Sequence, residues 1–224
     1  SAFSALDSFP LMAIPFFILA GALMEKGGLS SRLIAFANSL MHSYTGGLAL
    51  VTMVSCLFFA ALSGSSPATV AAVGSIMFPA MVKKGYDPEF SAAVSASGGG
   101  LGILIPPSIP LIIYGIVANV SISDMFLAGF GPGFLSAIFL SVTVYIIARK
   151  RGYTGSGNPI VWKKVRKALW DAKWALLAPV IILGGIYGGI FTPTESAVIA
   201  VLYAFVIGLF IYKELNLENI KKAF

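Results

Sequence analysis

The stretch Ser63-Gly64-Ser65-Ser66-Pro67-Ala68-Thr69-Val70 interrupts a long apolar segment near its middle. No Asp, Glu, Lys or Arg occurs between Arg32 and Lys83, so the segment has the composition of chain embedded in a membrane. Backbone that leaves the helix at membrane depth must have its N–H and C=O groups satisfied by protein, water or a bound ion. The interruption therefore predicts a binding site rather than a simple transmembrane span.

A second uncharged stretch, Phe90 to Ser123, is interrupted twice. The first interruption is Ser97-Gly98-Gly99-Gly100, and the second is Pro106-Pro107-Ser108-Ile109-Pro110. Broken helices in membrane proteins typically line substrate and ion sites near the bilayer midplane. Two such regions close together in the sequence favour a transporter.

The composition indicates an integral membrane protein. Of the 224 residues, 58% are hydrophobic and only 11% are charged, whereas soluble domains average about 25% charged residues. Several uncharged runs are long enough to cross a hydrocarbon core, which takes roughly 20 residues of helix. We therefore expect an all-α polytopic membrane protein.

The net charge of +6 does not indicate nucleic-acid binding, because the basic residues cluster at the ends of apolar runs. These clusters are Lys83-Lys84, Arg149-Lys150-Arg151, the residues from Lys163 to Lys173, and Lys213 with Lys221-Lys222. This distribution is typical of cytoplasmic loops. All clusters fall on one side only if the segment around Ser63 is a re-entrant hairpin, which also suits its arms of about 15 residues, roughly 22 Å each.

The predicted organisation has five parts. They are a scaffold transmembrane helix at 1–26, an interfacial arm helix at 27–46, a transport-core half at 47–148, a cytoplasmic amphipathic connector at 149–173, and two scaffold transmembrane helices with a cytoplasmic end at 174–224. Within the transport-core half we expect a re-entrant hairpin at 48–82, a broken helix at 90–118 and a transmembrane helix at 125–148. Residues 160–173 alternate aromatic and basic side chains, which is typical of an anchor facing anionic lipid at the membrane interface.

The hairpin tip and the broken helix together predict a sodium site. Hydroxyl and carbonyl oxygens are the ligands that hard cations prefer, and the negative end of a helix dipole would face the ion. The glycines would also let the two elements approach closely. The expected sodium-binding residues are Ser63, Gly64, Ser65, Ser66, Gly99, Gly102 and Pro106.

The same region offers two helix N-termini to an anionic substrate. Pro67 would begin the second arm after a serine cap, and Ser108 would cap the second half of the broken helix. Helix N-termini bind carboxylates without a basic side chain. The expected substrate-binding residues are Ser65, Ser66, Pro67, Thr69, Pro107 and Ser108.

Other interpretations have less support in the sequence. Serine and glycine in membrane helices often serve only close packing, and this explanation suffices for Ser65 taken alone. Glu195, in Thr192-Pro193-Thr194-Glu195, is expected to cap the next helix rather than relay protons. No nucleophile and base, paired carboxylates or phosphate loop can be assembled, so we expect neither an enzyme nor a cofactor beyond the coupling Na⁺. A passive channel or a structural membrane subunit stays open.

Four motifs give the chain a family resemblance that runs along essentially its whole length. They are the segments from Phe9 to Gly21, from Ser63 to Val70, from Gly102 to Pro110, and from Gly189 to Glu195. Their order and spacing resemble the large membrane subunit of tripartite ATP-independent periplasmic (TRAP) transporters. Ser-Gly-Ser-Ser-Pro-Ala-Thr and Ile-Leu-Ile-Pro-Pro-Ser are most similar to the dicarboxylate branch.

The resemblance implies half of a sodium-driven elevator transporter with an inverted repeat, in the bacterial inner membrane. The chain would be an N-terminal-half fragment of the subunit, because the family's early spans, second hairpin and second broken helix have no counterpart here. The implied partners are a small membrane subunit and a periplasmic substrate-binding protein that delivers an organic acid. A C4-dicarboxylate is the first expected substrate, with sialic acid or another sugar acid as the alternative.

Overall fold

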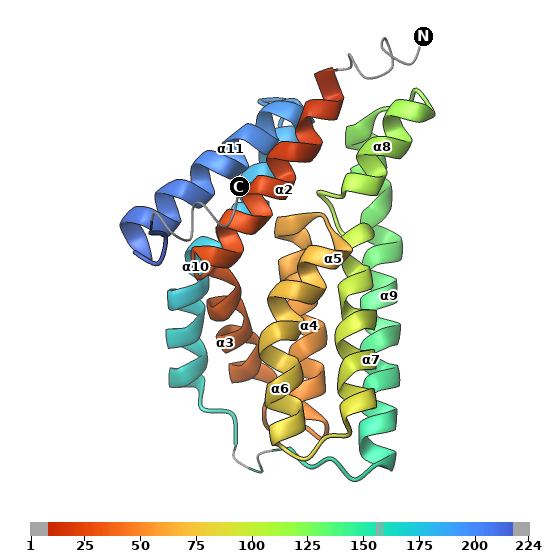
Figure 1. Cartoon of the computed structure of the whole chain (residues 1–224), viewed down its shortest axis with the longest axis vertical. Helices are drawn as coiled ribbons and strands as arrows, with labels where there is room; N and C mark the ends of the chain where they lie inside the picture. Colours follow the sequence, from red (N-terminus) through yellow and green to blue (C-terminus); the bar gives the residue numbers. More distant parts are fainter. Residues whose placement is uncertain (1–8, 156, 158, 217–224) are drawn as a thin grey trace.

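The computed structural model describes residues 9–155, 157 and 159–216, and every regular element in this part of the chain is helical (Figure 1). One group of helices holds α2, α3, α10 and α11, and the other holds the elements from α4 to α9. The first group comprises η1 (Phe9–Met12), α2 (Ala13–Lys26), α3 (Leu29–Met41), α10 (Trp162–Tyr187), α11 (Pro193–Val206) and the π-helical η4 (Ile207–Ile211). The second comprises α4 (Gly47–Ser63), α5 (Ser66–Thr69), the π-helical η2 (Val70–Gly74), α6 (Ser75–Lys83), α7 (Pro88–Gly99), η3 (Gly100–Ile103), α8 (Ile109–Val117) and α9 (Ile122–Lys150).

Within the described residues, three helices are long and apolar enough to cross a membrane: α9, α10 and the stretch Pro193–Ile211. A fourth span exists if Pro10–Lys26 and Leu29–Met41, which are bent by 66° to each other, count as one. The expectation of an all-α, multi-pass membrane protein is confirmed. The helices from α4 to α8 are all shorter, which fits segments that enter a bilayer without crossing it as one straight helix.

The corner between α2 and α3 depends on two glycines. Gly28 has a left-handed backbone (φ 79°), and its carbonyl oxygen accepts a hydrogen bond of 2.7 Å from Arg32 Nη1. The Gly27 N–H donates to the carbonyl oxygen of Leu23 and closes the last turn of α2. A residue other than glycine is strained at a positive φ. The chain therefore turns where the sequence analysis expects the first helix to stop.

The structure differs from expectation at α10. From the sequence we expect the amphipathic connector to end at residue 173 and a separate span to begin after it, but α10 runs unbroken from Trp162 to Tyr187. Its first Pro is Pro179 and its first Gly is Gly184, so nothing in the chain stops the helix at residue 173. The connector and the span are thus one rod that is basic and aromatic at its start and apolar afterwards. The membrane placement of residues 149–173 stays a prediction.

The capping expectation for α11 is confirmed. The Thr192 hydroxyl accepts a hydrogen bond from the Glu195 N–H (3.3 Å), and the Glu195 carboxylate accepts one from the Thr192 N–H (2.8 Å). This reciprocal arrangement is a capping box, with Pro193 in the first turn. Glu195 is thereby assigned to helix capping.

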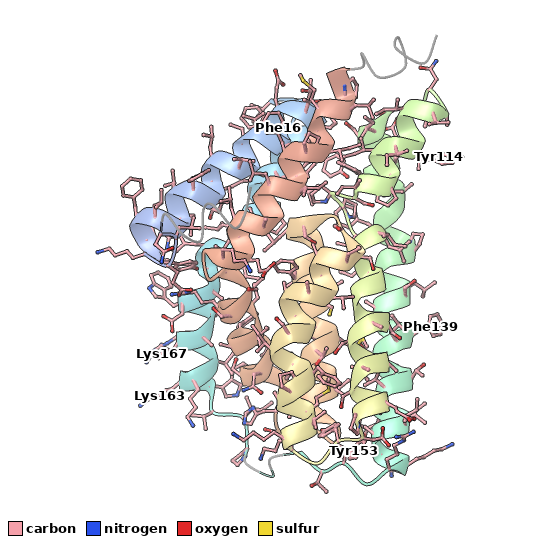
Figure 2. All side chains as sticks on the ribbon, in the orientation of Figure 1. Phe16, Tyr114, Phe139, Tyr153, Lys163 and Lys167 are labelled. Carbon is pink, nitrogen blue, oxygen red and sulfur yellow. The ribbon has the colours of Figure 1, made fainter. Side chains whose placement is uncertain are left out.

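Residues that follow α9 hold together the lower end of the second group (Figure 1). The Tyr153 hydroxyl accepts a hydrogen bond from the Asp87 N–H (3.0 Å), and the Tyr153 carbonyl accepts one from the Gly46 N–H (2.9 Å). The Tyr153 ring stacks on Tyr86 with centroids 4.2 Å apart, and Arg151 pairs with Asp87 at 3.4 Å. Figure 2 shows Tyr153 at this end of the molecule. One segment thus links the starts of α4 and α7.

Replacing Tyr153 by Phe should destabilise this end of the molecule, because the Asp87 N–H loses its partner. We expect a loss of about 1 kcal/mol in the free energy of unfolding, measured by thermal unfolding of the full-length protein in detergent. Tyr145→Phe on α9, where the side chain is 37% exposed, is the control and should change nothing measurable. Equal stability of the two variants would contradict a structural role for the Tyr153 hydroxyl.

Candidate ion and substrate site

The hairpin reverses direction within two residues. Helix α4 ends at Ser63, Gly64 has a left-handed backbone (φ 60°), and Ser65 is extended (φ −137°, ψ 126°). The second arm is helical from Ser66 to Lys83, with a π-helical stretch at η2. Its first intrahelical hydrogen bond runs from the Thr69 N–H to the Ser65 carbonyl, so the preceding N–H groups have no partner inside the helix. The tip thus has a helix C-terminus beside a helix N-terminus.

A buried network of oxygen atoms connects the two arms. The Ser63 and Thr69 hydroxyl oxygens are 3.0 Å apart, and the Thr69 hydroxyl donates to the Ser65 carbonyl oxygen at 2.8 Å. The Ser63 hydroxyl lies 3.3 Å from the same carbonyl oxygen. Ser63 and Thr69 are almost fully buried, whereas Ser65 is partly exposed. Three oxygens from two arms therefore gather in one small volume.

The tip contacts the second break of the broken helix directly. The Gly64 carbonyl accepts a hydrogen bond of 3.0 Å from the Ile109 N–H, the first residue of α8. A Cβ on Gly64 would collide with the carbonyl oxygen of Pro107 and lie 3.4 Å from Ser108 Cα. The N-terminus of α8 is therefore held against the hairpin tip, as Figure 1 shows in the region between α5 and α8.

The first break of the same helix contacts the other side of the tip through two glycines. A Cβ on Gly102 would lie 2.6 Å from the Ser65 carbonyl oxygen and 2.8 Å from Thr69 Oγ1. A Cβ on Gly99 would collide with Val70 and lie 3.3 Å from the Ser66 carbonyl oxygen. The expectation that this glycine run permits close approach is confirmed.

Ser108 departs from the expected capping role. Its backbone is at the N-cap position of α8, but its hydroxyl donates to the Ile103 carbonyl at 2.7 Å instead of accepting from the helix. The bond joins the two halves of the broken helix by satisfying a carbonyl at the end of η3. The expected serine cap of the hairpin's second arm is likewise not formed: Ser65 occupies the N-cap position without a capping hydrogen bond from its side chain, and Pro67 follows Ser66 in the first turn.

The structure brings most of the expected site residues together, and two of them lie outside the cluster. Pro106 Cγ lies 3.5 Å from where a Cβ of Gly129 would be, so Pro106 packs toward α9. Pro67 is exposed at the start of the second arm. The residues in contact across the tip and the broken helix are Ser63, Gly64, Ser65, Ser66, Thr69, Gly99, Gly102, Pro107 and Ser108.

Two participants were not expected. A Cβ on Gly21 of α2 would lie 3.2 Å from Ser63 Cα and Cβ, so the first group of helices touches the tip at this glycine. The backbone N–H of Ile109 is the second. Gly21 sits in an apolar span with no break beside it, and a backbone donor carries no side-chain signal. Neither could be found from residue types alone.

Replacing Gly102 by Ala should force the broken helix away from the hairpin tip. Overpacking of this kind typically costs 1–3 kcal/mol, so we expect a loss of about 2 kcal/mol in the free energy of unfolding. Gly100→Ala is a matched control in the same short helix, because a Cβ there meets nothing within 4 Å. Thermal unfolding of both full-length variants gives the comparison, and equal stability would contradict the close contact.

Comparison with known proteins identifies relatives along the whole chain. The family model for the tripartite ATP-independent periplasmic transporter, DctM component, matches residues 1–224. The chain is 51% identical over 209 residues to the C4-dicarboxylate TRAP transporter large permease protein DctM of Vibrio cholerae, covering 93% of this chain and 46% of that protein.

Two further relatives carry other substrate names. The chain is 51% identical over 215 residues to the isethionate TRAP transporter permease protein DctMQ of Oleidesulfovibrio alaskensis, covering 96% of this chain and 34% of that protein. It is 44% identical over 220 residues to the sialic acid TRAP transporter permease protein SiaT of Haemophilus influenzae, covering 96% of this chain and 35% of that protein. The chain thus spans one third to one half of these relatives. It belongs to the DctM family of tripartite ATP-independent periplasmic transporter components, a family of transporters rather than enzymes.

Proposed function

We propose that the full-length protein is the membrane subunit of a sodium-coupled secondary transporter that imports an organic acid. The observation that carries the proposal is the contact between the hairpin tip and both breaks of the broken helix. This contact brings hydroxyl and carbonyl oxygens together with helix ends of both polarities. Membership of a transporter family supports it.

The oxygen network between Ser63, Ser65 and Thr69 is the proposed sodium site. A hydroxyl that donates one hydrogen bond keeps lone pairs that a cation can use. In the structure these groups satisfy one another, so an incoming Na⁺ would replace part of the network and not fill a ready-made cage. The C-terminus of α4 directs its partial negative charge at the same place.

The helix N-termini at Ser66 and Ile109 are the proposed substrate site. Each helix leaves N–H groups of its first turn without an intrahelical partner and has a positive dipole end, although the Ile109 N–H itself already donates to the Gly64 carbonyl oxygen. Neither Lys nor Arg occurs anywhere from Leu33 to Val82 or from Tyr86 to Ala148. A carboxylate would therefore be held by backbone donors and by the Ser65 and Ser66 hydroxyls.

Movement of α4 to α8 as one block past α2, α10 and α11 is the proposed transport step. The expected scaffold touches the hairpin tip at Gly21 of α2, and because glycine has no side chain, no Cβ would obstruct movement of the tip at this contact. Gly64, Gly99 and Gly102 join the tip to the broken helix and would keep the block together during such a movement. The inverted repeat expected for an elevator requires a second half beyond this chain.

The proposed partners are a small membrane subunit and a periplasmic substrate-binding protein, in the bacterial inner membrane. The family description names a tripartite periplasmic system, and the relative of Vibrio cholerae is named a large permease protein. The name DctMQ fits a relative in which two membrane components form one chain. A passive channel or a structural subunit is the competing function.

The transport assay uses proteoliposomes with the full-length protein, its small subunit and its binding protein, together with an inward sodium gradient. The expected result is accumulation of succinate with sodium and none with potassium. Parallel assays use sialic acid and isethionate, two organic anions that appear in the names of relatives, and they identify the substrate class. An ion current without accumulation of any compound would establish a channel and reject coupled transport.

Ser63→Ala tests the ion site, because it removes a hydroxyl oxygen that lies 3.0 Å from the Thr69 hydroxyl oxygen and 3.3 Å from the Ser65 carbonyl oxygen. Loss of one ligand should raise the half-saturating sodium concentration about tenfold, a change of about 1.4 kcal/mol. Ser75→Ala in the second arm of the hairpin is the control and should leave the half-saturating sodium concentration unchanged. An unaltered sodium dependence in Ser63→Ala would support the structural-subunit explanation.

A further inference from the structure

A cavity of about 620 Å³ lies between α3, α10 and the residues that follow α11. Its lining includes Arg32 from α3, Lys164 and Lys167 from the first turns of α10, and Trp170 and Trp174 from the next turns. None of these residues belongs to the hairpin tip or the broken helix. The cavity is therefore separate from the proposed transport site.

The lining leaves two cations available for a ligand. Within the described residues, neither Lys164 nor Lys167 forms an ion pair. Arg32 is already engaged, because it pairs with Glu214 at 2.6 Å and lies over the Tyr212 ring at 3.7 Å. Asp171 also lines the cavity, so the two lysines leave it with a net positive charge. A ligand with one or two negative charges would complement it.

A smaller hollow continues along α3 beyond this cavity. A second hollow of about 320 Å³ shares Ala35, Lys164 and Ala168 with the first and adds His42 and Asn38. Figure 2 shows Lys163 and Lys167 pointing outward from the lower part of α10. Lys164 lies at the junction of the two hollows, where it can reach a ligand in either.

The cavity lies at the level expected for lipid headgroups. Helix α10 is basic and aromatic before Trp174 and apolar from Ala175 onward, so this junction marks the membrane–water interface. Trp170 is 69% exposed, and Lys173 Nζ lies 3.8 Å from the centre of its ring. Ile211 lines the same cavity beside Phe210, which is 71% exposed. Polar and apolar binding surfaces thus meet at one place.

We propose that this cavity binds an acidic phospholipid, with Lys164 and Lys167 holding the headgroup phosphate. Trp170 and Trp174 would contact the glycerol region, and Ile211 and Phe210 would contact the start of an acyl chain. Juxtamembrane Lys and Arg residues attract anionic lipid in general, but a cavity lined by them would also bind the lipid headgroup at one defined position. Because α3, α10 and the residues that follow α11 all contribute, the lipid would connect the start of α3, next to the corner at Gly27 and Gly28, to the rest of the scaffold.

The test titrates short-chain phosphatidylglycerol into the purified full-length protein in detergent and follows the rise in Tm. The double variant Lys164→Gln with Lys167→Gln should raise the half-saturating lipid concentration about tenfold. The control variant Lys163→Gln with Arg166→Gln removes the same charge from the same helix turn, at residues that do not line the cavity. It should change the half-saturating lipid concentration less than twofold. Tm without lipid, measured for each variant, shows that the fold is intact.

Three outcomes would overturn the proposal. Equal weakening by the two double variants would mean general attraction to the basic helix. An equal rise in Tm with phosphatidylcholine would mean that the acidic headgroup is not recognised. An equal rise with inorganic phosphate at the same concentration would mean a site for a free anion and not for a lipid. Should the Lys164 and Lys167 variant lower Tm without lipid, quenching of tryptophan fluorescence by brominated phosphatidylglycerol gives an independent measure of binding at the cavity.

Discussion

The hydrogen bond from the Ile109 N–H to the Gly64 carbonyl solves the main physical problem of this chain. Two apolar segments leave the helix, and the freed backbone groups must find partners where no charged side chain is near in the sequence. The structure pairs the break in one segment with the break in the other. Gly64, Gly99 and Gly102 make the approach possible because a Cβ at any of them would meet the facing backbone or side chain.

Contacts elsewhere in the molecule position these two breaks next to each other. At the end remote from the hairpin tip, Tyr153 links the starts of α4 and α7, so the two helices begin at positions fixed relative to each other. On the other side α2 reaches the tip at Gly21, and α11 packs along α2. The ion pairs found within the described residues lie near helix ends, as in the pair of Arg32 with Glu214. Neither of the two apolar segments that contain the breaks carries Asp, Glu, Lys or Arg.

The sequence predicts local breaks well because Gly, Pro and Ser act on their own backbone. The turn at Gly64, the close packing of Gly102 and the cap at Thr192 follow from residue type. Ser108 shows the limit, since its hydroxyl had two possible partners and tertiary packing selected the Ile103 carbonyl. The continuity of α10 follows from the lack of a helix-stopping residue at position 173, although the composition changes there from basic to apolar. The contact at Gly21 depends on what lies across the molecule, which residue patterns do not reveal.

The central claim is that the hairpin tip and the broken helix together form an ion site. The most direct measurement is a high-resolution cryo-electron microscopy structure of the full-length protein, once in sodium and once in potassium. The account predicts a sodium-dependent density beside the oxygens of Ser63, Ser65 and Thr69, with the tip still in contact with Gly102. An identical self-bonded tip without an ion in both salts would contradict it and leave the contact with a structural role alone.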